Sequence, residues 1–295
     1  MDDDDAPEAV GLVEPTAKTA TMEEYRAALK AFDASVCEAL AIGQAIAGRI
    51  AAPHLGYATY IFARICAHAT SLVRAAPKSR WTHTESEFWE FSAIAGHSRS
   101  IIEGQLLLFY IIKEPKSPEE WSARVNIMHL NDCSRRIKIL ESVIESAESA
   151  AFSARAEEYR DRLRGNPWFS GLDQNLQKRL LSGDALTITT RDDQIAEIGW
   201  DKKHFYMIWN LLSQYTHILP LSFYRMEPNG RGTGIENDFD RAYIYMMLRM
   251  GTDILADCTN RMAEAFPDTA WARNGVESKF SPGPSCNRPR KRGRR

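Results

Sequence analysis

Apolar residues recur every three to four positions over long stretches of the chain, which is the spacing of one face of an α-helix. The pattern predicts long helices over residues 25–50, 54–75, 85–113, 117–147, 201–219 and 237–266. Thr21 to Glu24 and Ser117 to Glu120 have the capping-box form that begins a helix, and Pro53, Pro220 and Pro267 follow predicted helix ends. We therefore expect an all-α fold, a bundle of five to seven long helices.

The remaining segments suggest one helical domain between two tails. We expect this domain over residues 21–270, with an irregular insertion or cap at 168–200 that contains a short helix at 172–181 and a β-prone stretch, ALTITT, at 185–190. The pattern leaves open whether residues 149–164 continue the fourth helix or fold back. Residues 1–20 are acidic and residues 271–295 are basic, which predicts a disordered tail at each end.

Composition and cysteine spacing indicate an ordinary globular protein. The 295 residues are 44% hydrophobic and 26% charged, and the five cysteines lie far apart with no C-x-x-C pair. The chain begins MDDDDAPEAV, which lacks the basic start and apolar run of a secretion signal, and its apolar runs fall short of the roughly 20 residues that cross a bilayer. We expect a cytoplasmic protein without a transmembrane segment.

The last eight residues, RPRKRGRR, carry six positive charges, although the whole chain has a formal net charge of -2. Such a cluster can hold nucleic-acid phosphates, act as a nuclear import signal or contact an anionic membrane, and a solvated tail is the simpler alternative. The residues that could contact nucleic acid are Arg288, Arg290, Lys291, Arg292, Arg294 and Arg295.

A polar stripe crosses the third predicted helix, which is otherwise apolar on most sides. At 100° per residue, Arg99 and Glu103 share a narrow sector with Tyr110. A helix that is apolar all round is usually buried, so we expect this charged pair to face other protein groups or a cleft. The base precedes the acid, whereas a pair that only strengthens its own helix prefers the opposite order. The order therefore favours a tertiary partner.

A second polar stripe lies on the helix predicted at 201–219. Tyr206, Asn210, Ser213 and His217 are spaced four, three and four residues apart, so they share one face, between apolar neighbours. Buried polar groups need hydrogen-bond partners. We expect this stripe to meet the Arg99 and Glu103 stripe away from bulk solvent.

These residues permit two interpretations. In a catalytic site, His217 would be the general acid or base, Glu103 would orient its ring, Arg99 would hold a phosphate or developing negative charge, and Ser213 would be a nucleophile. Tyr206, Asn210 and Tyr110 would then bind the ligand. Alternatively, the same groups form a satisfied network that fixes the register of two helices. Both interpretations remain open at this point.

The stretches SRSIIEGQLLLFYIIKEP and YMIWNLLSQYTH resemble a widespread group of uncharacterised bacterial all-helical proteins with an R-x-x-x-E helix early and an S-x-x-x-H helix late. The resemblance spans about residues 30–265. It implies a HEPN-like helical fold, related to nucleotide-associated and ribonuclease domains, and a dimer, but no established activity. HEPN ribonucleases carry an Arg and a His four to six residues apart. Only RVNIMH, Arg124 to His129, approaches that motif, and Val125 stands where a polar residue is expected.

Two functions follow as hypotheses. The first is a regulatory or interaction protein with a buried polar network, which binds an unknown protein partner or itself. The alternative is a HEPN-like ribonuclease or nucleotide-binding protein of a defence or toxin system. Neither E-x-x-H nor H-E-x-x-H occurs, so we expect no metal site and no cofactor. Whether the protein is an enzyme stays undecided from the sequence.

Overall fold

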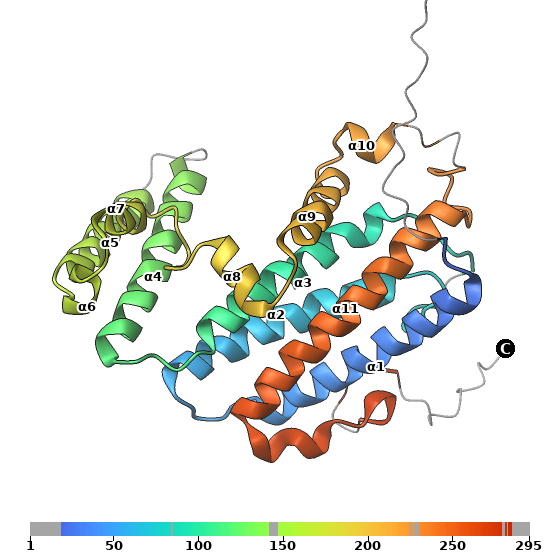
Figure 1. Cartoon of the computed structure of the whole chain (residues 1–295), viewed down its shortest axis with the longest axis horizontal. Coiled ribbons are helices and arrows are strands. Elements are labelled where there is room, and N and C mark those ends of the chain that lie inside the picture. The colour runs from blue at the N-terminus through green and yellow to red at the C-terminus, as the bar shows by residue number, and fades with distance from the viewer. Residues whose placement is uncertain are drawn as a thin grey trace, which may run out of the picture. The chain divides into compact units, whose positions relative to one another are not determined.

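The computed structural model describes residues 19–83, 85–141, 147–224, 226, 230–278, 281, 283 and 284, and these residues are helical or irregular, without a strand (Figure 1). The expected all-α class is therefore confirmed for this part of the chain. The β-prone stretch at 185–190 forms no strand. Its last residue, Thr190, instead caps α8 (Arg191–Ile198) by accepting from the Asp193 backbone N–H at 3.2 Å.

The chain divides into two compact units, where the pattern suggested one domain over residues 21–270. The first unit comprises residues 1–45, 65–102 and 209–295, and the second comprises 46–64 and 103–208. Three helices, α2 (Pro53–Ala75), α3 (Ser92–Ile111) and α9 (Lys202–Thr216), have several residues in each unit. Each unit is described by itself below.

The first unit is built around α1 (Met22–Ile46) and α11 (Asp238–Ala265), which run side by side (Figure 1). It also contains α9 (Lys202–Thr216) from Trp209 onward and the short α10 (Pro220–Phe223). A Cβ atom at Gly251 of α11 would lie only 2.9 Å from the ring of the buried Phe32, so the absent side chain allows close packing on α1.

Helix starts in this unit follow local hydrogen bonds. The capping box at α1 is confirmed, because Glu24 N–H donates to Thr21 Oγ1 at 3.2 Å and Thr21 N–H donates to the Glu24 carboxylate at 2.8 Å. By contrast, α3 begins at Ser92, not at 85. The Trp89 N–H donates to the Gly234 carbonyl at 2.9 Å, which holds the preceding residues outside the helix.

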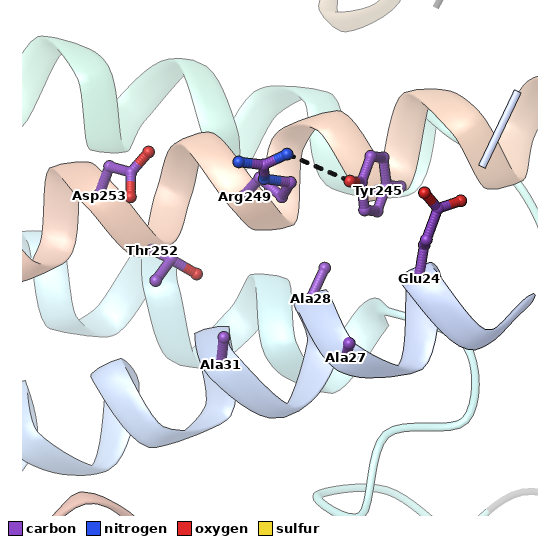
Figure 2. Close-up of a pocket in the computed structure, with 8 residues that line it drawn as sticks. All are labelled: Glu24, Ala27, Ala28, Ala31, Tyr245, Arg249, Thr252 and Asp253. Atoms are coloured by element: carbon purple, nitrogen blue, oxygen red, sulfur yellow. Dashed lines mark hydrogen bonds between the residues drawn. The ribbon is translucent and has the colours of Figure 1, made fainter. Parts of the chain in front are cut away.

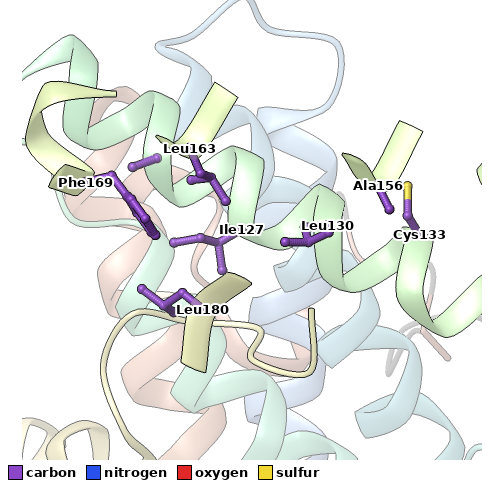
Figure 3. Packing of buried hydrophobic residues seen from close by; sticks show 8 residues of the cluster. Ile127, Leu130, Cys133, Ala156, Leu163, Phe169 and Leu180 are labelled. Atoms are coloured by element: carbon purple, nitrogen blue, oxygen red, sulfur yellow. The ribbon is translucent and has the colours of Figure 1, made fainter. Parts of the chain in front are cut away.

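The second unit contains α4 (Pro118–Glu141), α5 (Ala147–Arg164), α6 (Pro167–Ser170), α7 (Gln174–Leu181) and α8. Residues 149–164 thus lie in a helix of their own, α5, which packs along α4. Figure 3 shows their shared core. The core side chains are those of Ala123, Ile127, Leu130, Cys133, Ala156, Leu163, Phe169 and Leu180. The segment expected as an irregular insertion, 168–200, consists largely of short helices with side-chain caps from Asn166, Asp173 and Thr190.

Both expected tails are only partly described. Residues 1–18 and 285–295 lie outside the described part, and with them the nucleic-acid contact residues proposed for the basic tail. At the start, Ala20 is buried and its carbonyl accepts from Arg241 Nε at 2.7 Å. Near the end, 3₁₀ turns cover Pro267–Ala272 and Gly275–Glu277, and the Gly275 N–H donates to Glu38 at 3.0 Å. The folded part therefore continues past residue 270.

None of the described helices is both long enough and apolar enough to span a bilayer.

Candidate functional site

Three of the predicted site residues meet in the first unit. One terminal nitrogen of Arg99 on α3 lies 3.1 Å from Ser213 Oγ and 3.1 Å from His217 Nε2, at and just beyond the last turn of α9. The guanidinium carbon of Arg99 also lies 4.5 Å from the ring centroid of Trp209, a cation–π contact. These contacts join α3 to the C-terminal end of α9.

The directions of the hydrogen bonds define what the three side chains can do. Ser213 donates its hydroxyl proton to the Trp209 carbonyl at 2.7 Å and accepts from Arg99. Because a guanidinium only donates, His217 Nε2 accepts in this contact and the neutral ring carries its proton on Nδ1. A serine nucleophile needs its hydroxyl directed at a base. Here the serine proton points to a backbone carbonyl and the imidazole acceptor is occupied by Arg99.

This group of side chains is more exposed to solvent than we predicted, because the sequence pattern placed it away from bulk solvent. Arg99 and Ser213 are half-buried, but His217 is exposed. The physical reason is that α9 ends at Thr216, so His217 lies on the turn that leaves the packed part of the helix. The periodic stripe of polar residues had predicted that the helix continues through residue 219, with His217 on its buried side.

The other four predicted site residues are divided between the two units. Glu103 is exposed on the part of α3 that belongs to the second unit, and Asn210 is exposed on α9 in the first. In the second unit, the Tyr110 hydroxyl accepts from the Ile188 N–H at 3.3 Å, and the Tyr206 hydroxyl donates to Asp192 at 2.8 Å. Tyr110 and Tyr206 therefore have partners outside the Arg99 group.

The RVNIMH motif does not form a joint site in the second unit. Arg124 pairs with Glu120 and donates to the Lys113 carbonyl at 3.0 Å. The two ring nitrogens of His129 lie 3.0 and 3.1 Å from the hydroxyls of Tyr57 and Tyr159. Arg124 and His129 are thus held by different groups.

A histidine pair that the polar stripes did not reveal links α2 and α3 in the first unit. His68 Nδ1 and His97 Nδ1 are 3.2 Å apart, and the ring centroids are 5.5 Å apart. One nitrogen of such a pair donates and the other accepts, so the contact needs at least one neutral ring. Nothing in the spacing of residues along either helix identifies His97 as the partner of His68.

We expect the stability of the first unit to depend on pH through His97. Burial lowers the pKa of His97 below its ordinary value of 6.5. The unfolded chain therefore binds a proton more readily than the folded chain, so the free energy of unfolding should fall as the pH drops below 6.5 and until the folded pKa is passed. Thermal melting between pH 7.5 and 5.5 measures this, and His97→Gln should lose less stability than the parent.

The matched control is His204→Gln, because His204 is exposed. Its melting temperature should change with pH as that of the parent does. Burial also lowers the pKa of His54, so the stability of every variant should still depend on pH to some extent. Equal pH dependence in the parent and His97→Gln would contradict the prediction.

A buried ion pair, equally unexpected from the sequence, anchors the glycine-rich stretch at residues 230–234 to α11. Arg231 donates to the Tyr215 hydroxyl at 2.8 Å and to Asp240 Oδ1 at 3.3 Å, and both charged side chains are fully buried. Although Arg231 stands among three glycines, its side chain lies in the core of the unit and contacts the rings of both Tyr215 and Tyr243.

The turn after α9 carries an unusual backbone conformation. The His217 N–H bonds to the Ser213 carbonyl and the Leu219 N–H bonds to the Gln214 carbonyl, which closes the helix around Ile218 in the left-handed region at φ 52°. Glycine usually occupies this position, because a Cβ atom there costs roughly 1–2 kcal/mol. A β-branched residue at positive φ is a conformational outlier.

Neither metal coordination nor comparison with known proteins assigns a function to this site. Within the described ranges, no three His, Cys, Asp or Glu side chains gather in a way that could hold a metal ion. Comparison with protein-family models, with curated proteins and with solved structures finds no match. The interpretation of the site therefore depends on its geometry.

Proposed function

We propose that this protein is a cytoplasmic interaction protein with a regulatory role, and that its protein partner binds the segment 218–224 of the first unit. The observation that carries the proposal is a run of exposed large apolar side chains. They belong to Ile218, Leu219, Leu221, Phe223 and Tyr224. Single exposed apolar residues are common, whereas a contiguous group of them is typical of a protein-binding surface.

The strain at Ile218 supports the same proposal. Its side chain is 76% exposed, so it gains little from burial in the free protein, and yet it occupies a backbone conformation that favours glycine. Strained residues persist where a function requires them. A partner that covers the Ile218 side chain would recover the apolar burial that the free protein lacks, at roughly 25 cal/mol per Å².

The Arg99 group supports a structural role beside this segment. Its donors and acceptors pair with one another and with the Trp209 carbonyl, so it can fix the end of α9, from which the segment begins. In this proposal Arg99, Ser213 and His217 position the binding surface. The partner is a protein that presents apolar side chains of its own.

The test uses a variant that separates stability from binding. Ile218→Gly should raise the free energy of unfolding by about 1 kcal/mol, because the left-handed strain is removed. The same variant should weaken partner binding, and Ile218→Gly combined with Phe223→Ser should abolish it. Affinity purification from the source cells, followed by titration of the purified partner, measures binding, and urea denaturation measures stability.

Ile235→Gly is the matched control. Ile235 is 70% exposed in the same unit, but its φ is not positive, so this variant should gain no stability and should keep the partner. Retention of every co-purifying protein by the Ile218→Gly/Phe223→Ser variant would refute the proposal. RNA cleavage or nucleotide binding that disappears in His217→Ala would refute it as well, in favour of the HEPN-like alternative.

A further inference from the structure

Three described residues near the end of the chain, Ser281, Gly283 and Pro284, form a strap on the first unit. The Gly283 N–H donates to Ser281 Oγ at 3.2 Å. Gly283 lies directly on the Trp81 ring, because a Cβ atom there would come within 2.7 Å of two ring carbons. Arg80 donates to the Pro284 carbonyl. The strap is therefore held by the loop that follows α2.

The thiol of Cys37 on α1 lies beside the same arginine. Its sulfur is 3.5 Å from Arg80 Nη2, whereas Arg80 Nη1 donates to the Pro284 carbonyl. The Ser281 side chain also hydrogen-bonds to this sulfur, and the thiol donates to the Asp33 carboxylate at 3.6 Å. Cys37 is only 1% exposed. One guanidinium thus contacts both a buried thiol and the last residue that the structure describes.

The groove that α1 forms with α11 lies on the other side of α1. Its volume is about 360 Å³, and it is lined by Glu24, Ala27, Ala28, Ala31, Tyr245, Arg249, Thr252 and Asp253 (Figure 2). At 100° per residue, Asp33 and Cys37 point away from the α1 residues of this lining. The environment of the thiol is therefore separate from the groove.

A second cysteine, Cys286, stands two positions after Pro284. Consecutive Cα atoms are 3.8 Å apart, so the Cα atom of Cys286 lies within about 7 to 8 Å of the Cα atom of Pro284. The two Cα atoms of a disulfide are about 4.4–6.8 Å apart. Because Pro284 and Cys37 contact one guanidinium, two residues of chain are enough for Cys286 to reach Cys37 while the strap stays in place.

The two thiols differ in their reactivity toward an oxidant. Six of the nine residues that follow Cys286 are arginine or lysine, and neighbouring cations stabilise a thiolate, which is the form that attacks peroxides. Burial, by contrast, raises the pKa of the Cys37 thiol. A peroxide should therefore react first at Cys286, and Cys37 should react second, with the oxidised Cys286.

We propose that Cys286 and Cys37 form a reversible disulfide that fastens the basic tail to α1 when the protein meets a peroxide. The Cys286 thiolate breaks the O–O bond of hydrogen peroxide and becomes a sulfenic acid, and the hydroxide released takes up the proton that the thiol had lost. The Cys37 sulfur then forms the S–S bond, while its proton and the sulfenic hydroxyl leave as water. Two thiols are oxidised and one hydrogen peroxide is reduced to two waters.

The bond regulates the tail and leaves the segment 218–224 unchanged, so this inference goes beyond the proposed partner-binding function and does not depend on it. Disulfides of reducing compartments are usually transient and redox-sensing. Thiol exchange with glutathione would reopen the bond and release the basic residues that follow Cys286.

Peptide mapping without reductant tests the bond. The full chain, first reduced and then treated with a small excess of hydrogen peroxide, should remain a monomer and give a linked peptide pair that contains Cys37 and Cys286. Dithiothreitol should separate the pair. Cys286→Ser and Cys37→Ser should each abolish it, and the first of these variants leaves the core unchanged. Cys133→Ser, in the second unit, should form the bond as the parent does.

The role of the strap is tested by Gly283→Ala. The added Cβ atom meets the Trp81 ring, which is fixed by its bond from Nε1 to Asp33 at 2.6 Å. The strap should therefore detach, and disulfide formation should slow by about tenfold, because the effective concentration of Cys286 at Cys37 falls. Gly56→Ala is the matched control, since a Cβ atom there meets nothing within 4 Å, and it should react like the parent.

Melting temperatures check that all variants fold. A peroxide-treated parent in which Cys286 stays unpaired, joins a cysteine other than Cys37 or links two copies of the chain would overturn the proposal. Equal rates of disulfide formation in the parent and Gly283→Ala would show that the strap does not position Cys286.

Discussion

Replacing Arg231 with methionine should lower the free energy of unfolding of the first unit by about 3–5 kcal/mol. The substitution leaves the Asp240 carboxylate fully buried without its cation, and a buried unpaired charge is far more costly than an exposed one. Asp240 also accepts from the Phe91 N–H at 3.1 Å and from Asn237 Nδ2 at 2.8 Å, so it cannot readily turn out to solvent. Urea denaturation, with hydrogen exchange of the buried α11 amides, measures the loss.

Arg162→Met is the matched control for this prediction. Arg162 also pairs with a carboxylate, Glu158, and lies 5.5 Å from a tyrosine ring centroid, but both charged side chains are 55% exposed. Exposed ion pairs contribute roughly 0.2–1 kcal/mol, so the control should change stability little. If Arg231→Met cost no more than Arg162→Met, the buried pair would not stabilise the unit as argued.

Asp33→Asn should destabilise the first unit by about 3 kcal/mol and release the loop that follows α2. The buried Asp33 carboxylate accepts from Arg80 through two guanidinium nitrogens, one at 3.0 Å, and from Trp81 Nε1 at 2.6 Å. An asparagine amide would direct N–H donors at the donors of Arg80 or Trp81. Hydrogen exchange at residues 79–82 should therefore increase, together with the loss of stability in urea.

Asp132→Asn provides the comparison, because Asp132 also binds an arginine, Arg136, at 2.8 Å, but both side chains are more than half exposed. Its stability should change by less than about 1 kcal/mol. Unchanged exchange at residues 79–82 in Asp33→Asn would contradict the anchoring role of this carboxylate.

The helices were predictable because their signals are local. The capping box at Thr21 and the helix stops near Pro53 and Pro267 depend on neighbouring residues, so short-range pattern placed these boundaries within a few residues. The start of α3 was misplaced because it depends on a bond from Trp89 to Gly234, which lies far away in the sequence. The β-prone ALTITT stretch forms no strand for a similar reason, since β-propensity takes effect beside neighbouring strands and the described part of the chain has none.

The candidate site was predictable to the extent that a helical stripe defines a face. That Arg99 contacts Ser213 and His217 agrees with the two stripes facing each other. A stripe does not specify which neighbour each residue contacts. It could therefore not distinguish Tyr110 and Tyr206 from the residues of the Arg99 group, although their partners are Ile188 and Asp192. It also could not reveal that the helix ends before His217.

The strongest polar contacts of the first unit gave no signal in the sequence. Arg231 lies in a glycine-rich loop and Asp33 in an ordinary amphipathic helix, and both look like solvated charges by pattern. Their burial arises because α11 and the loop after α2 supply partners from distant positions. Tertiary pairing of this kind is not encoded in spacing along one element.

The discontinuous make-up of the first unit also affects how the protein folds during synthesis. Its three stretches are separated by residues 46–64 and 103–208, so α1 leaves the ribosome long before α11 exists. At about 5–20 residues per second, α1 waits roughly 10–40 s for the helix that covers Phe32. Most of the second unit, by contrast, is one continuous stretch and can complete its core first. Nascent α1 therefore depends on chaperones or on temporary contacts to shield its apolar face until the last third of the chain has emerged.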